Sequence, residues 1–123
     1  MENFNKLLKK GLELQKKGNF KEALKIYNEL ILKDKKNAQL LLFLGTLHLQ
    51  INNNEEAKNY LELSLDIEKN NITTISNLAL AYEKLEKKEE AIKLFKKSIE
   101  ISHNNPETFF RIANLYSGEK KYE

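Results

Sequence analysis

Apolar residues recur along this chain at the three- and four-residue spacing of amphipathic helices, and short polar stretches separate the apolar segments. In the segment 72–85, Ile75, Leu78 and Tyr82 share one helix face. The pattern predicts first helices at about 4–17, 38–51, 72–85 and 106–118, and second helices at about 20–34, 54–68 and 88–102. Each first helix pairs with a second one, except the last.

The whole pattern repeats every 34 residues. Several independent columns keep this period: Asn3, Asn37, Asn71 and Asn105; Leu7, Leu41, Ile75 and Phe109; Gly11, Gly45, Ala79 and Ala113; Ala23, Ala57 and Ala91; Tyr27, Leu61 and Phe95; and Leu14, His48, Tyr82 and Tyr116. Chance does not explain so many columns with one period and no gap. The chain is therefore expected to be a repeat array.

Local signals mark where the helices begin. Each periodic Asn directly precedes a first helix, where its side-chain oxygen can accept a hydrogen bond from a free backbone N–H of the first turn. At Asn105 the next residue is Pro106, which suits the first helical position. Gly18 and the run 52–54 mark turns inside the repeats.

Small residues predict a close approach between paired helices. Packed helix axes lie about 8–10 Å apart, and small side chains allow the shorter distance. A glycine inside a helix costs about 0.5–1 kcal/mol relative to alanine, so Gly11 and Gly45 suggest a tight crossing. We expect this small-residue column to face the alanine column of the second helices.

These columns resemble the tetratricopeptide repeat, a 34-residue helix–turn–helix unit. The third repeat fits the motif best, with Ile75, Leu78, Ala79, Tyr82, Ala91, Phe95 and Ser98. The family's Trp and end-of-repeat Pro are absent, and Lys10 stands where later repeats have Leu. The resemblance implies an all-α, right-handed superhelical solenoid of about three and a half repeats. It would form a single array over residues 1–123, with repeats at 4–37, 38–71 and 72–105 and a truncated fourth at 106–123.

The last helix has no second helix of its own within this sequence. Phe109, Ile112 and Tyr116 are expected to pack back on the third repeat. Two adjacent aromatic residues, Phe109 and Phe110, are unusual for an end helix, because terminal repeats usually present a polar outer face. The sequence therefore indicates a piece of a longer chain, or an apolar end that meets a partner, including self-association through 106–118.

Composition narrows the remaining functions. There is no Cys, so disulfides and thiolate chemistry are excluded, and a cytoplasmic location is expected. The longest apolar run, 40–44, is far shorter than the ~20 residues of a membrane span. Net charge is +3, but the 21 basic residues are interleaved with 18 acidic ones, often as Glu four residues before Lys. This arrangement favours a solvated helix surface over binding of nucleic acid or a membrane.

No catalytic, cofactor-binding or metal-binding residues are predicted. His48 and His103 have no second His, Cys or carboxylate at metal-ligand spacing, and no Gly-rich phosphate loop is present. His48 occupies a column otherwise filled by large side chains, so we expect it to pack in the core. His103 lies in a turn between repeats and is expected to be exposed. The pattern indicates a protein that is not an enzyme.

In the tetratricopeptide repeat family, the first helices line a concave groove that holds partner peptides. The inward positions that we select as candidate site residues are Leu8, Leu12, Leu42, Phe43, Thr46, Asn77, Leu80, Phe110, Arg111 and Asn114. Their apolar members can serve a partner or pack between neighbouring first helices. In some family members, Lys, Asn and Arg groups in the groove hold the C-terminal carboxylate of chaperone peptides. Leu8 and Leu12 occupy slots that should supply two of these groups, so this mode is not expected.

The resemblance implies a non-catalytic protein-interaction module, a scaffold or adaptor, whose partner is a protein or peptide of unknown identity. A different class stays open as the alternative: the N-terminal substrate-docking segment of a larger enzyme, such as a glycosyltransferase or sulfotransferase. A helical-repeat reader of RNA is disfavoured by the strict 34-residue period and the single Arg.

Overall fold

The computed structural model describes residues 3–102 and 106–120. It contains seven helices in this part of the chain: α1 (Phe4–Lys16), α2 (Phe20–Lys33), α3 (Ala38–Gln50), α4 (Asn54–Ile67), α5 (Ile72–Lys84), α6 (Lys88–Ile101) and α7 (Pro106–Lys120). All seven begin at the residue that the sequence predicted. The first six end one residue before the predicted end, and α7 extends two residues beyond it. The predicted all-α repeat architecture is confirmed.

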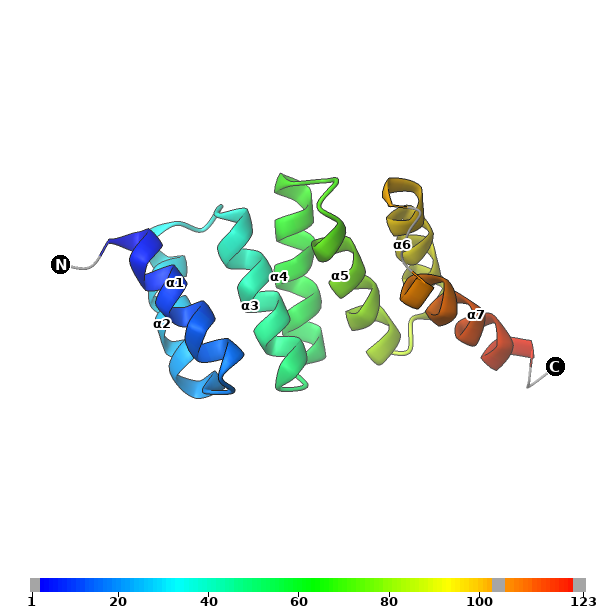
Figure 1. Cartoon of the computed structure of the whole chain (residues 1–123), viewed down its shortest axis with the longest axis horizontal. Helices are drawn as coiled ribbons and strands as arrows, with labels where there is room; N and C mark the ends of the chain where they lie inside the picture. The colour runs from blue at the N-terminus through cyan, green and yellow to red at the C-terminus, as the bar shows by residue number, and fades with distance from the viewer. Residues whose placement is uncertain (1–2, 103–105, 121–123) are drawn as a thin grey trace.

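The helices form two layers along one elongated stack (Figure 1). Helices α1, α3, α5 and α7 make one layer, and α2, α4 and α6 lie behind it. Each even helix packs on the odd helices before and after it in the sequence, and α3 also contacts both α1 and α5. Every helix therefore touches near neighbours in sequence, as expected for a solenoid.

The periodic columns form the core between the layers. Tyr27, Leu61 and Phe95, one from each even helix, are at most 1% exposed. The alanine column of Ala23, Ala57 and Ala91 is completely buried. Burying a large apolar side chain contributes about 1.5–3 kcal/mol, so each repeat adds a comparable increment to the stability of the stack.

The small residues of the odd helices do allow a tight approach to the even helices. In the third repeat, Ala79 and Ala91 belong to one buried cluster. A Cβ added to Gly11 would lie 2.5 Å from Cε1 of Tyr27, and one added to Gly45 would lie 2.4 Å from Cγ of Leu61. At Gly11 and Gly45 the nearest side chains are Tyr27 and Leu61, so these glycines make room for the large column of the even helices. The large side chains need the space because they fill the centre of each helix pair.

The predicted helix caps are present at the three odd helices whose preceding residues are described. The backbone N–H of Lys6 donates to Oδ1 of Asn3 at 2.8 Å, and Leu40 and Thr74 donate in the same way to Asn37 and Asn71. The even helices have no side-chain cap. Asn105, the fourth predicted cap, and His103 lie outside the described residues.

The turn inside each complete repeat uses the left-handed backbone region at one position. Gly18, Asn52 and Glu86 have φ angles of 84°, 64° and 63°, and they are 34 residues apart. The next residue in each turn donates its N–H to the carbonyl of the residue five positions earlier, as Asn53 does to His48 at 2.8 Å. Glycine adopts this region without strain, whereas Glu86 does so at a cost.

The last helix packs on the third repeat partly as predicted. Ile112 does pack against the third repeat, together with the buried Leu115. Tyr116, which is 38% exposed, also meets this repeat, because the ammonium of Lys96 on α6 lies 5.4 Å from the centre of its ring. Phe109, however, is 49% exposed. Leu41 and Ile75, the equivalents of Phe109 in the second and third repeats, are at most 1% exposed, and no described helix follows α7. The face of α7 that would receive such a helix is therefore open.

Candidate protein-binding surface

The predicted site residues all lie on the layer of α1, α3, α5 and α7, which we call the odd-helix face. Near its N-terminal end, a cavity of about 230 Å³ opens between α1 and α3. Its lining consists of Asn5, Leu8, Lys9, Leu12, Gln39 and Phe43. The structure thus brings together three of the predicted apolar residues, Leu8, Leu12 and Phe43, around one hollow.

These three apolar residues differ in how far they serve the core. Leu8 is only 5% exposed and belongs to the cluster around Tyr27. The ring of Phe43 is tilted against that of Tyr27, with centroids 6.1 Å apart, so Phe43 also supports the fold. Leu12 is half-buried and belongs to none of the core clusters. It is the member most available to a partner.

The middle of the face is occupied by interactions within the protein. The hydroxyl of Thr46 donates to the carbonyl of Leu42 at 2.9 Å and accepts from Nδ2 of Asn77 at 3.1 Å. Leu42 packs against the second core cluster, which contains Leu49 and Leu78. Leu42 and Thr46 line neither the α1–α3 cavity nor the two cavities near the C-terminal end of the face. For Leu42, the structure favours packing between neighbouring odd helices.

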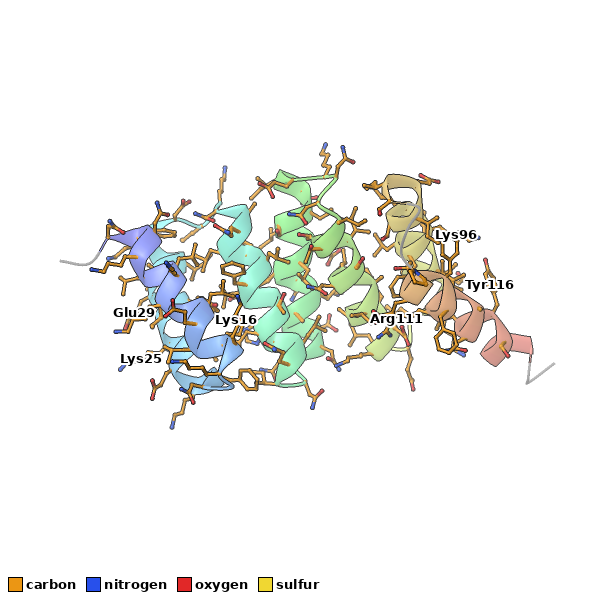
Figure 2. All side chains as sticks on the ribbon, in the orientation of Figure 1. Lys16, Lys25, Glu29, Lys96, Arg111 and Tyr116 are labelled. Atoms are coloured by element: carbon orange, nitrogen blue, oxygen red, sulfur yellow. The ribbon has the colours of Figure 1, made fainter. Side chains whose placement is uncertain are left out.

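Arg111 organises the C-terminal part of the face. Its side chain lies between α5 and α7 (Figure 2). Its guanidinium lies 3.2 Å from a carboxylate oxygen of Glu107 and 3.6 Å from one of Glu83 on α5. One cavity of about 290 Å³ is lined by these three residues together with Phe110 and Asn114. Partly exposed ion pairs contribute only ~0–1 kcal/mol, so the pair acts mainly by positioning the groups.

Two cavities therefore share Arg111 and Glu107. The second, of about 160 Å³, reaches from them to Asn77 and Leu80 on α5. Phe110 is 65% exposed, which makes it a large uncovered apolar group beside this region. Leu80 is half-buried against the third core cluster. The C-terminal part of the face thus combines an exposed ring with a carboxylate-rich hollow.

A buried polar chain behind the α1–α3 cavity was missed by sequence reasoning. The hydroxyl of Tyr27 donates to Oε1 of Gln15 at 2.7 Å, and Nε2 of Gln15 donates to Oε1 of Gln50 at 2.7 Å. The chain links α1, α2 and α3 and satisfies a hydroxyl that would be costly to bury alone. One signal could have revealed it: Tyr27 is the only member of its column with a polar atom to satisfy.

His48 is packed in the core, as predicted. It is 8% exposed, its ring stacks on Tyr60 with centroids 5.4 Å apart, and Nδ1 lies 3.2 Å from the Asn53 amide nitrogen. Burial lowers its pKa below the usual 6.5. Among the residues that the structure describes, no three His, Asp or Glu side chains gather as a metal site, and no helix is long and apolar enough to cross a membrane.

Comparison with known proteins agrees with this geometry. Two tetratricopeptide repeat models match residues 14–81 and 73–105. The first TPR of Spaghetti (RPAP3), bound to the HSP90 peptide SRMEEVD, has a TM-score of 0.88 at 22% identity, covering 93% of this chain and 90% of that one. MamA gives 0.91 at 21% identity, covering 96% and 69%, and the Arabidopsis OM64 TPR domain gives 0.86 at 20%, covering 91% and 93%.

Comparison with proteins of curated function gave no match. The solved structures are too distant in sequence to show more than the fold, but one family model alone spans more than half of this chain. The 34-residue columns, the asparagine caps and the two-layer stack all agree with that match. The chain belongs to the tetratricopeptide repeat family.

Proposed function

We propose that this chain is a non-catalytic adaptor of the cytoplasm, a single array over residues 1–123 that captures a peptide of a partner protein along the odd-helix face. Neither a nucleic acid nor a membrane is the ligand in this proposal, since acidic and basic residues alternate on the helices. The observation that carries it is the α1–α3 cavity, where an apolar hollow meets the available side chain of Leu12. The structural relative that holds a peptide supports the same mode of use.

The chemistry of the face favours an apolar anchor on the partner. The RPAP3 relative holds a peptide that ends in acidic and apolar residues, EEVD. In this chain, Leu8 and Leu12 offer no positive charge, and the guanidinium of Arg111 is already shared by two carboxylates. Lys9 is then the one cation in the lining of the α1–α3 cavity that could meet a terminal carboxylate. A large apolar side chain in the α1–α3 cavity, beside the ammonium of Lys9, suits this lining better.

The test is selection from a random peptide library displayed on phage, followed by fluorescence polarisation with the selected peptides. Leu12→Glu and Phe110→Glu should weaken binding at least tenfold, because each places a charge where an apolar group docks. Neither residue belongs to a core cluster, so the fold should persist. Leu32→Glu is the matched control, since Leu32 is 76% exposed on the other layer.

Two results would contradict the proposal. One is a selection that yields no peptide. The other is a set of peptides whose affinities are the same for Leu12→Glu, Phe110→Glu and the wild type. Circular dichroism of each variant shows whether the helices are intact, so that loss of binding is not mistaken for loss of the fold.

We also propose that two copies associate through α7. The specific observation is the ring of Phe109 on this helix, which is 49% exposed. Tyr116 is 38% exposed, and the ammonium of Lys96 lies over its ring. Burying such rings against a second copy would remove apolar surface from water. Light scattering over a range of concentrations tests this: Phe109→Asp should abolish association, and Leu32→Asp should not. A protein that stays monomeric at high concentration would contradict the proposed association through α7.

A further inference from the structure

Another cavity lies on the side of the even helices. It has a volume of about 300 Å³ and opens between α4 and α6, over α5. Its lining consists of Glu62, Leu65, Asp66, Leu78, Tyr82, Glu90, Lys93 and Leu94. We call it the α4–α6 cleft. Its volume is at the lower end of the range for ligand pockets, about 300–1,000 Å³, which suits one side chain or a similarly small group.

The cleft has an apolar floor, and a change in one column explains why it is open. Leu65, Leu78, Leu94 and the ring of Tyr82 form the floor. One repeat earlier, the positions of Tyr82 and Leu94 are held by His48 and Tyr60, whose rings stack with only 11° between their planes. Leu94 has no aromatic ring and cannot stack on the ring of Tyr82 in this way. The space above Tyr82 is therefore left free.

The rim of the cleft is negatively charged. Three carboxylates, those of Glu62, Asp66 and Glu90, face one ammonium, that of Lys93. The hydroxyl of Tyr82 donates to Oε2 of Glu62 at 3.1 Å and holds this carboxylate beside the floor. Lys58 also attracts the carboxylate of Glu62 electrostatically, but its ammonium forms an ion pair with Glu55 at 2.7 Å.

This arrangement of carboxylates is not repeated at the equivalent positions of the preceding repeat. The lining carries a net charge of −2, from three carboxylates and one ammonium, whereas the whole chain carries +3. One repeat earlier, Asn28 and Leu32 stand where the cleft has Glu62 and Asp66. The acidic rim thus coincides with the opening that Leu94 leaves. The net positive charge of the chain does not account for this coincidence.

We propose that the α4–α6 cleft binds an arginine or lysine side chain of a partner protein. The alkyl stem would lie on the leucines and Tyr82 of the floor, and the cationic head would reach the carboxylates of the rim, as long basic side chains do at apolar surfaces with a charged edge. Guanidinium suits the site best, because it bonds carboxylates through several N–H groups and is weakly hydrated. This site is separate from the proposed peptide groove and does not depend on it.

The probe is n-butylguanidinium, which reproduces the stem and head of arginine. It is titrated into isotopically labelled protein, and amide chemical shifts are followed by NMR at constant ionic strength. Shifts should concentrate at Leu65, Tyr82 and Leu94, with a dissociation constant on the order of millimolar, as expected for so few atoms. Butyrate, which has the opposite charge, and n-butanol, which has none, should produce no such pattern.

Two variants separate shape from charge. Leu94→Tyr copies Tyr60 of the neighbouring repeat, so it should fill the cleft and weaken binding at least tenfold while every charge remains. Glu62→Gln with Asp66→Asn keeps the shape, removes two charges and should weaken binding to a similar extent. Glu29→Gln, at an exposed carboxyl of α2, is the matched control and should bind like the wild type.

The outcomes decide the proposal. Scattered or absent shifts with n-butylguanidinium would overturn it, as would shifts that persist when Glu62 and Asp66 are neutralised. The spectrum of each variant also reports whether it folds. If Leu94→Tyr fails to fold, the Glu62→Gln, Asp66→Asn variant tests the proposal alone. Its amide replacements lie at exposed positions of α4 and leave the packing unchanged.

Discussion

Replacing Gly45 with alanine tests the central packing contact of the array. In a free helix this change stabilises by about 0.5–1 kcal/mol, because alanine loses less backbone entropy. Here the new Cβ would lie 2.4 Å from Cγ of Leu61 and 2.6 Å from Cδ2. Cγ is the branch point of a completely buried side chain, so it cannot swing away. Overpacking of this kind costs about 1–3 kcal/mol.

The expected net result is a loss of about 1–2 kcal/mol in the free energy of unfolding. Urea unfolding followed by circular dichroism measures this loss. If the slope of the unfolding free energy against urea concentration is unchanged, only the stability has changed. The third repeat supplies the matched control, since it already has Ala79 in this column, buried beside Phe95. Ala79→Gly should also destabilise, by about 1–2 kcal/mol, because it loses both a packed methyl and helix propensity.

A double substitution sharpens the test. Leu61→Ala alone should cost about 2–5 kcal/mol, because it leaves a cavity. When Gly45→Ala is combined with it, the added methyl group has room, so the combined loss should fall short of the sum by about 0.5–3 kcal/mol. A Gly45→Ala variant as stable as the wild type, or strict additivity with Leu61→Ala, would refute the assigned contact.

Three further predictions concern caps, turns and pH. Asn37→Ala removes the acceptor of the Leu40 N–H and should lower the free energy of unfolding by about 1 kcal/mol, whereas Asn59→Ala, at an exposed helix position, should not. Glu86→Gly relieves a φ of 63° and should raise the thermal midpoint, with a gain of up to about 1 kcal/mol; a lower midpoint would count against strain there. Because burial lowers the pKa of His48, the unfolded chain binds the proton more tightly, so stability should decrease as the pH falls through 6.5. His48→Leu should flatten this decrease in unfolding curves measured on both sides of that pH.

Sequence reasoning was most accurate where the signals are local. Each periodic Asn that is described accepts the bond expected of a cap, because capping depends on residues within one turn. The odd helices begin where these caps predict. The repeat register also placed the predicted site residues on α1, α3, α5 and α7, since a common period puts equivalent residues on equivalent faces.

Contacts between distant residues were harder to predict. The register gave the face of Gly45 but not the side chain that fills the space beside it, which depends on the depth of helix interdigitation. Likewise, Arg111 was placed on the odd-helix face, but its capture by Glu83 on α5 requires the relative position of two helices. Phe109 is 49% exposed, and no described helix lies beyond α7 to cover it. The composition of the chain did not predict this exposure.

The sequence by itself determined the helices, their order and the period of the stack, because each depends on spacing within a repeat. Only the tertiary structure decided which surfaces are hollow. The lining of the α4–α6 cleft joins Tyr82 of α5 with Leu94 of α6, and its carboxylates come from α4 and α6. The α1–α3 cavity likewise depends on how far Leu12 and Phe43 stand apart after packing. Cavities are differences between the shapes of packed neighbours, and these differences arise only when the helices meet.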